Sequence, residues 1–446
     1  MSLYRRPCIT ALLVFLAGCT IRPVDDDAGT PPVDDGSALP ELVTEPGYVS
    51  EIETITARPD VMAAFQVIER QKEPSHRDLI RLTAIPAPPF MEERRASAYA
   101  AMLRTAGADS VWIDEVGNVL ALRRGTTRDR TVVLDGHLDT VFPEGTDVTV
   151  EQRGDTLFAP GVGDDTRGLI VVRDVLLSMV ESGIRTQGDV LFVGTVGEEG
   201  LGDLRGVKHI LRDGGARVDA WIAVDGGDET RVKVQAVGSH RFRVTFQGPG
   251  GHSWGAFGLA NPHHALGRAI ENFTLAADVH TGHGPRTSYS VGRIGGGTSV
   301  NSIPFESWME VDMRSIDTTR LAGIDSIFRA AVDSALSEEN EMRRDGAPLT
   351  VDVALVGDRP AGNVDVTTPL IQRAAAATRV LGGEPSASSS STNANYPMYL
   401  GIPATTIGRG GEGANAHALT EWWRPVNEDV AVKKALLLVL AEAGLE

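Results

Sequence analysis

The chain has 446 residues, of which 42% are hydrophobic and 23% are charged, values that are typical of a protein with two folded domains. Its formal net charge is -18. An acidic surface repels phosphate backbones, which excludes nucleic acid as a partner. Both cysteines, Cys8 and Cys19, lie close to the N-terminus, so any metal site in the folded body must use nitrogen and oxygen ligands.

The first residues have the pattern of a signal peptide. Arg5 and Arg6 precede an apolar run at 9–17, as the charged and hydrophobic regions of a signal peptide do. The run is too short to cross a membrane, because a membrane-spanning helix needs about twenty apolar residues.

Residues 16–19, LAGC, resemble the bacterial lipobox, in which cleavage before the cysteine leaves it lipidated at the new N-terminus. The resemblance implies a lipoprotein signal peptide at 1–18 and a lipid anchor on Cys19. The alternative is a plain signal peptide in which Cys19 is incidental. Thr20 follows, and by resemblance to Gram-negative sorting rules the absence of Asp there favours the periplasmic face of the outer membrane. Residues 19–48 are rich in Pro, Asp and Gly and are predicted to be a disordered tether in the cell envelope.

After the tether, short apolar strands alternate with helices, which predicts an α/β domain with a mainly parallel sheet covered by helices. The first part of this domain is predicted to extend over 49–235. The expected strands are 118–122, 131–134, 189–193 and 221–224, and the expected helices are 92–106, 169–179 and 207–212.

From about residue 236 the order of the expected elements changes to β-α-β-β-α-β, which is the order of the ferredoxin-like motif. The expected elements are strand 241–246, helix 262–276, strands 288–293 and 307–314, helix 319–336 and strand 349–355. The sequence therefore predicts an inserted second domain over 236–356. A helix at 368–381 then resumes the first domain, whose second part covers 357–446.

Polar side chains follow the expected strand that ends at Leu134. His137 and Asp139 are two residues apart, so on extended backbone their side chains face the same way. His137 can then ligate a metal ion while Asp139 accepts its other ring N–H and fixes the tautomer. A His-x-Asp pair is common by chance, but open α/β sheets collect ligands at the carboxyl ends of their strands, which favours a site here.

Two pairs of adjacent acids follow. Asp164 and Asp165 lie in a glycine-rich segment ahead of a helix; Asp164 is either a ligand or a plain loop acid beside an Asp165 that caps the helix. Glu198 and Glu199 lie just past a strand. Adjacent carboxylates repel each other unless a cation binds or one takes a proton. A metal site uses both facts, whereas the alternative is a solvated acidic loop.

Asp225 follows the strand that ends at Val224, and His417 lies in a glycine-containing segment of the resumed domain. Either residue alone means little. Together, successive strands deliver an acid or a histidine to the same edge of the sheet, and a distant histidine supplies a further nitrogen ligand. Coincidence is then the weaker explanation.

These five motifs, in this order, resemble the co-catalytic zinc peptidases that include peptidase T, carboxypeptidase G, aminoacylase and succinyl-diaminopimelate desuccinylase. The resemblance covers the chain from about residue 75 to the C-terminus. It implies a hydrolase of peptide or related amide bonds that uses two zinc ions, although cobalt or manganese suits the same ligands. The implied ligands are His137 and Asp225 for one zinc, Glu199 and His417 for the other, and Asp164 as a bridge between both. Asp139 would orient His137, and Glu198 would be the general base.

The resemblance also makes the inserted domain a lid and dimerisation domain, which implies a homodimer. Residues 250–253, GGHS, match the lid histidine motif, and His252 would stabilise the oxyanion, including that of the partner subunit's site. Asn301 and Arg314 match lid residues that hold substrate. A guanidinium group grips a carboxylate through two hydrogen bonds, which suits Arg314 to this role; the alternative for Arg314 is a surface salt bridge.

The ligand after the fourth strand carries the substrate prediction. Family members that act on free amino termini, such as peptidase T, tend to have Asp there, whereas carboxypeptidases and deacylases tend to have Glu. Asp225 therefore favours an aminopeptidase of short peptides. The alternatives are a carboxypeptidase or N-acyl-amino-acid deacylase and, from another class, a lipoprotein that binds peptides or metals without catalysis. Glu198 argues against the last, because a pure binder needs no base. Thr166, Arg167 and Asn393 depart from the family pattern and could retune the substrate pocket without touching a ligand.

Overall fold

The computed structural model describes residues 39–446. The expected signal peptide, the lipobox and Cys19 lie outside the described residues. Within 39–446, no helix is both long and apolar enough to cross a membrane. The end of the expected tether differs from the prediction, because Leu42 is buried and helix α1 begins at Pro46. The Glu45 backbone N–H donates to the side chain of Gln372 at 2.8 Å, so this stretch is fixed to the folded body.

The larger domain contains a nine-stranded sheet in the order β1-β2-β6-β3-β7-β17-β8-β15, with β16 also paired to β8. The central neighbours β6, β3, β7 and β17 are parallel, whereas β1, β2 and β15 are antiparallel additions at the edges. The strands are β1 (Ser110–Ile113), β2 (Val119–Arg123), β3 (Thr131–His137), β6 (Asp189–Thr195), β7 (Ala220–Val224), β8 (Arg231–Ala236), β15 (Gly362–Asn363), β16 (Ser386–Ser390) and β17 (Ala404–Ile407). The predicted α/β class with a mainly parallel sheet is confirmed.

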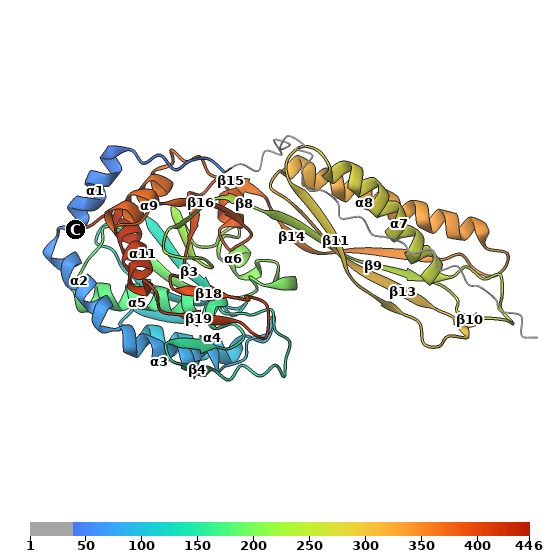
Figure 1. Cartoon of the computed structure of the whole chain (residues 1–446), viewed down its shortest axis with the longest axis horizontal. Helices are drawn as coiled ribbons and strands as arrows, with labels where there is room; N and C mark the ends of the chain where they lie inside the picture. The colour runs from blue at the N-terminus through green and yellow to red at the C-terminus, as the bar shows by residue number, and fades with distance from the viewer. Residues whose placement is uncertain (1–38) are drawn as a thin grey trace, which may run out of the picture. The chain divides into compact units, whose positions relative to one another are not determined.

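Helices cover both faces of this sheet (Figure 1). Side chains alternate along each strand, so Val132 and Leu134 of β3 pack into the larger layer while Val133 packs into the smaller one. The larger layer contains α1 (Pro46–Thr56), α2 (Pro59–Arg70), α3 (Lys72–Thr83), α4 (Glu93–Thr105), α5 (Gly168–Glu181), α9 (Pro369–Val380) and α11 (Glu428–Ala443). The smaller layer contains α6 (Arg205–Ile210) and α10 (Asn395–Tyr399). Helices α1 to α3 precede the first element that the sequence predicted.

A small antiparallel sheet, β18-β19-β5-β4, joins two distant parts of the chain. Its strands are β4 (Glu151–Arg153), β5 (Thr156–Phe158), β18 (Glu412–Ala414) and β19 (Trp422–Arg424). Trp422 and Trp423 pair with Phe158 and Leu157. The loop between β18 and β19, which carries His417, is thereby fixed beside the segment that carries Asp164.

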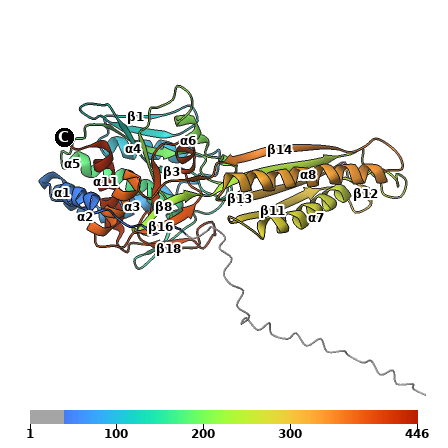
Figure 2. The same ribbon diagram turned by 90° about the horizontal axis from the view of Figure 1, so that it is seen from above.

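The inserted domain has its own sheet, in the order β11-β13-β9-β14, and all its pairs are antiparallel. Its elements are β9 (Gly238–Gln247), β10 (Gly251–His252), α7 (Pro262–Thr281), β11 (Thr287–Gly296), β12 (Ser302–Ile303), β13 (Glu306–Ser315), α8 (Thr318–Met342) and β14 (Thr350–Arg359). Helices α7 and α8 lie along one face of this sheet (Figure 2). Between them and the sheet lies a separate hydrophobic core that includes Phe242, Phe273 and Phe328. The predicted ferredoxin-like order is confirmed.

Candidate metal centre and active site

The candidate site lies at the carboxyl ends of the parallel strands. His137 is the last residue of β3, Glu198 and Glu199 follow β6, and Asp225 follows β7. Because β6, β3 and β7 are neighbours in the sheet, their ends meet at one edge, as in other open α/β sheets that bind ligands there. A cavity of about 310 Å³ lies at this edge, and its lining includes Asp164, Glu198, Glu199, Asp225 and His417.

Asp164 lies between the two histidines, with one carboxylate oxygen facing each of them. His137 Nε2 is 3.2 Å from Asp164 Oδ1, and His417 Nε2 is 3.2 Å from Asp164 Oδ2. His417 Nε2 also lies 2.9 Å from Glu199 Oε1. One donor atom each of His137, Asp164 and Glu199 lies within 4.8 Å of the others. The structure thus brings four of the five expected ligands into direct contact and places Asp225 in the lining of the same cavity.

These residues fit divalent cations. Burial opposes a charge on His137, but contact with Asp164 and the charges of Asp165 and Glu198 raise its pKa well above the usual range. Contact with Asp164 and Glu199 raises the pKa of His417 to about 10. Both shifts have the same cause, which is that positive charge is favoured between these carboxylates, and a bound metal ion would supply that charge in place of protons. The donor set is nitrogen and oxygen, which suits zinc, cobalt or manganese.

Two further acids hold the chain that carries Asp164. Glu421 accepts hydrogen bonds from the backbone N–H groups of Gly161, Gly163 and Asp164 at 2.6, 2.9 and 2.8 Å. Asp165 accepts from the backbone N–H of His137 at 3.1 Å. The sequence-based alternative in which Asp165 caps the helix is wrong, because α5 has no side-chain cap. Asp165 instead joins the loop of one ligand to the strand of another.

Asp139 differs from the expectation that its carboxylate accepts the ring N–H of His137. His137 Nδ1 lies 3.0 Å from the backbone carbonyl oxygen of Asp139 and 3.9 Å from its carboxylate. The carboxylate accepts from the backbone N–H groups of Glu198 and Glu199 at 3.1 and 2.7 Å. Asp139 can therefore fix the His137 tautomer through its carbonyl group, leaving Nε2 free for a metal ion. Its carboxylate positions the two glutamates.

Glu198 is buried beside an arginine. Its side chain is 4% exposed, and burial raises its pKa to about 8; the charge of Arg359 opposes this rise and that of Glu199 reinforces it. Arg359 donates to Glu198 Oε1 at 3.0 Å and to the Glu198 backbone carbonyl. A carboxylate that accepts a proton near neutral pH, next to a metal ligand, has the properties of a general base.

The lid residues are divided between two places. Arg314 lines the cavity, where the expected substrate role would place it, and it also donates to Asp312 at 2.7 Å, which is the alternative salt bridge. His252 and Asn301 are exposed and are not among the residues that line the cavity. The backbone N–H of Ser253 donates to the Asn301 carbonyl at 2.9 Å. Within the chain, these two residues lie together but apart from the ligands.

Three residues that depart from the family pattern are buried and do not line the cavity, so any effect on the substrate pocket would act through the segments that they hold in place. Thr166 donates to the Gly161 carbonyl at 2.7 Å, and Arg167 donates to the Glu428 carbonyl at 3.1 Å. Asn393 is buried and donates to Asp135 and Thr195. All three are almost fully buried. Thr166 closes the turn at 161–166, whereas Arg167 and Asn393 join segments that are far apart in sequence.

Sequence reasoning missed Arg359, Arg409 and Glu421. Arg359 ends β14, and Arg409 follows β17, the strand beside β7. A position just past a strand end is a signal that was used for Asp225 and could have identified Arg409. Glu421 lies four residues after His417 in sequence, but no local pattern indicates that it binds the backbone of the Asp164 loop.

The comparisons with known proteins agree with this geometry. Residues 133–442 match the family described as Peptidase family M20/M25/M40. A succinyl-diaminopimelate desuccinylase of Alkalilimnicola ehrlichii is 30% identical over 227 residues, which cover 46% of this chain and 59% of that protein. The matched region is thus less than two thirds of the length of that relative.

Solved structures share the fold. The aminopeptidase PepT from Bacillus cereus has a TM-score of 0.64 and 20% identity, over 83% of this chain and 98% of that chain. The di-peptidase Dug1p from Saccharomyces cerevisiae has a TM-score of 0.67 and 16% identity, over 86% of this chain and 98% of that chain. At such identities the likeness shows the fold alone. The family match, however, extends over more than half of the chain and contains the strands that deliver His137, Glu199 and Asp225. The chain therefore belongs to peptidase family M20/M25/M40 and is a metal-dependent hydrolase of the peptidase and amidohydrolase type.

Proposed function

We propose that the protein is an aminopeptidase that hydrolyses short peptides with two zinc ions. The observation that carries this proposal is the position of Asp164, whose two carboxylate oxygens each face a different histidine, with the buried Glu198 lining the same cavity. His137 and Asp225 would hold one ion, Glu199 and His417 the other, and Asp164 would contact both. Bound there, the ions would polarise the scissile carbonyl and lower the pKa of a water molecule.

The chain's own residues would then move the proton and orient the substrate. Glu198 would accept a proton from the attacking water and return it to the leaving amine. Arg359 would hold the Glu198 carboxylate in place through its hydrogen bond at 3.0 Å. Arg314, at the edge of the cavity, would grip a carboxylate of the substrate. The non-catalytic alternative has no support from the family match.

The aminopeptidase assignment rests on Asp225, the residue type that the peptidase T-like branch has at this ligand position, and on the fold shared with the PepT aminopeptidase. A second candidate is an N-acyl-amino-acid deacylase or carboxypeptidase. The desuccinylase relative and the arginines around the cavity support this second candidate. A deacylase and a carboxypeptidase each need a group that binds a substrate carboxylate.

A substrate panel distinguishes these candidates. We expect the zinc-loaded, full-length protein in detergent to cleave tripeptides only when the amino terminus is free, since a blocked terminus removes the charge that an aminopeptidase site is built to bind. The measurement is kcat/KM for each tripeptide, for its N-acetylated form and for N-acyl amino acids, and we expect about 100-fold or greater preference for the free terminus. Exclusive cleavage of the acylated compounds would establish the second candidate instead.

The two adjacent glutamates should respond differently to the same substitution. We expect Glu198→Gln to retain zinc and to lower kcat by about 10²–10⁴-fold, the usual contribution of a general base. Glu199→Gln should lose zinc, because an amide replaces a charged ligand. Metal analysis and steady-state kinetics measure both effects. Turnover in Glu198→Gln equal to that of the wild type would remove Glu198 from this role.

We also propose that Cys19 anchors the protein to the outer membrane of a bacterial cell envelope, facing the periplasm. The lipobox resemblance of residues 16–19 supports this location. Cys19→Ser should move the protein from the membrane fraction to the soluble fraction, whereas Cys8→Ser, the matched control, should leave it anchored. Separation of the inner and outer membranes on a density gradient shows which of the two membranes contains the protein. Continued anchoring of Cys19→Ser would refute the lipobox assignment.

A homodimer formed through the lid is the last part of the proposal. Strand β11 is an edge of the lid sheet, and Leu275 and Val279 of α7 lie one helical turn apart with side chains 65% and 72% exposed. In such a dimer His252 and Asn301, which do not line the cavity of their own chain, would serve the second copy.

Sedimentation velocity tests the dimer. We expect Leu275→Asp combined with Val279→Asp to produce monomers, because buried unpaired charges oppose association. The control is Leu355→Asp on β14, the opposite edge of the lid sheet, where the side chain is 46% exposed; this variant should remain a dimer. A wild-type protein that sediments as a monomer at micromolar concentration would contradict the proposal.

A further inference from the structure

Five arginines line the cavity that holds the candidate ligands, and they differ in what they bind. They are Arg231, Arg241, Arg314, Arg359 and Arg409. Four of them hydrogen-bond to other parts of the protein. Arg359 donates to Glu198, Arg241 and Arg314 donate to Asp312, and Arg231 donates to the Gly226 carbonyl and to Ser388. Their guanidinium groups are thus partly or wholly committed.

Arg409 is the exception. It makes no hydrogen bond and no ion pair with any residue in the described part of the chain, although its side chain is only 9% exposed. The nearby acids are engaged elsewhere, because Glu421 binds the backbone of the 161–164 loop and Asp164 faces the two histidines. The positive charge of Arg409 favours the ionised forms of Asp164, Asp165 and Glu421, but its N–H groups donate to none of these three carboxylates. Because Arg409 lines the cavity and its N–H donors are unused there, the side chain is suited to bind an anionic group of a ligand.

Glycines make room for the guanidinium group. A Cβ atom on Gly163 would lie 2.7 Å from Arg409 Nη2, and one on Gly226 would lie 3.6 Å from Nη1. Gly163 is next to Asp164 and Gly226 is next to Asp225, so the guanidinium lies against the backbone that carries two of the candidate ligands. The arginine is therefore close to the position at which a substrate would react.

Arg409 also connects this cavity to a neighbouring one. The second cavity, of about 360 Å³, is lined by Trp422 and Trp423 among others, and it shares Gly227 and Arg409 with the first. A ligand whose reacting bond lies beside Asp164 can therefore extend toward Arg409, with the indole groups beyond it. The acids Asp228 and Glu412 also line the second cavity, so a substrate carboxylate is favoured beside Arg409, where the two cavities meet, and not deeper among those acids.

We propose that Arg409 is a specificity-determining residue that binds a carboxylate of the substrate, and that the substrate is therefore an acidic peptide or acyl amino acid. This inference rests on the proposed hydrolase activity. The guanidinium would donate two parallel hydrogen bonds to the carboxylate. Arg314 lines the same cavity from the lid, so a substrate with a second carboxylate can engage both arginines.

Matched substrates test the proposal with the zinc-loaded, full-length protein. The pairs are tripeptides with Glu or Gln at each position, and N-succinyl or N-butyryl amino acids. We expect the wild type to prefer the acidic member of at least one pair. Arg409→Met should lower kcat/KM for that member by at least about 30-fold, mainly through KM, because it removes one partner of a buried charge pair. The neutral member should change by less than about 3-fold.

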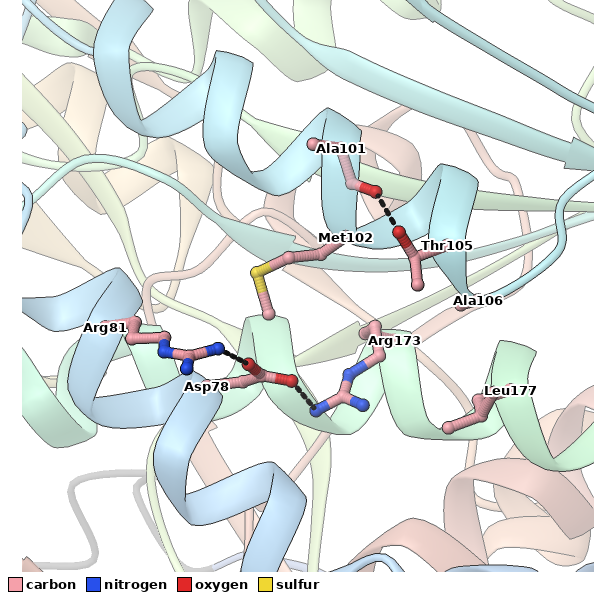
Figure 3. Close-up of a pocket in the computed structure, with 8 residues that line it drawn as sticks. All are labelled: Asp78, Arg81, Ala101, Met102, Thr105, Ala106, Arg173 and Leu177. Carbon is pink, nitrogen blue, oxygen red and sulfur yellow. Dashed lines mark hydrogen bonds and ion pairs between the residues drawn. The ribbon is translucent and has the colours of Figure 1, made fainter.

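Two further variants complete the test. Arg409→Lys keeps the charge but loses the two-pronged geometry, so it should recover only part of the preference, and it also serves if Arg409→Met does not fold. The charge control is Arg81→Met. Arg81 lines a different cavity, formed with Met102 and Leu177, and pairs there with Asp78, which also binds Arg173 (Figure 3). This control should retain the wild-type preference. Equal losses on acidic and neutral substrates in Arg409→Met would overturn the proposal.

A binding measurement separates failure of this inference from failure of the proposed activity. If no compound in the panel is hydrolysed, the proposed activity fails. Calorimetry with glutarate and with its neutral diamide still measures whether Arg409 binds a carboxylate. We expect glutarate to bind the wild type at least about 10-fold more tightly than it binds Arg409→Met, and the diamide to bind neither. Glutarate binding that is equal in the two proteins, or absent from the wild type, would overturn the carboxylate site.

Discussion

Mutual repulsion of carboxylates is the constraint on which the rest of the site depends. Asp164, Glu198, Glu199 and Asp225 line one cavity, and like charges this close cannot all be ionised without compensation. The protein supplies that compensation from several directions. The two histidines contact Asp164 and Glu199, Arg359 contacts Glu198, and the oxygens of Asp139 and Glu421 are occupied by backbone N–H groups. Divalent cations suit this site because they add positive charge where the carboxylates converge.

The sequence predicted the parts of the site that follow a local rule. A polar residue just past an apolar strand is visible without a structure, and this rule identified His137, Glu199 and Asp225. The fold class followed from the alternation of strands and helices, and the inserted domain from the order of its elements. Helices α1 to α3 were not predicted, although they contribute to the larger core; the predicted tether, which ends at residue 48, overlaps only the start of α1.

The supporting contacts could not be predicted because they join segments that are far apart in sequence. Arg359 and Glu198 are separated by 161 positions, and Glu421 and Gly161 by 260. Asp139 shows a second limit of prediction from sequence. Spacing correctly predicts that it lies beside His137, but only the structure shows that its carbonyl faces the ring and its carboxylate faces the glutamate backbone. Residue type and spacing do not determine which oxygen of a residue is used.

The order of strands in the larger sheet also constrains how the chain folds during synthesis. Strand β17 lies between β7 and β8, yet it is formed by residues 404–407, long after the ribosome has released the lid sequence. The inserted domain has its own hydrophobic core and can fold as a unit, whereas β7 and β8 are not joined through β17 until residues 404–407 have been made. Arg409, His417 and Glu421 follow that same strand. A nascent chain is consequently without His417 and Glu421 until translation is almost finished, so the candidate metal centre is completed only at the end of synthesis.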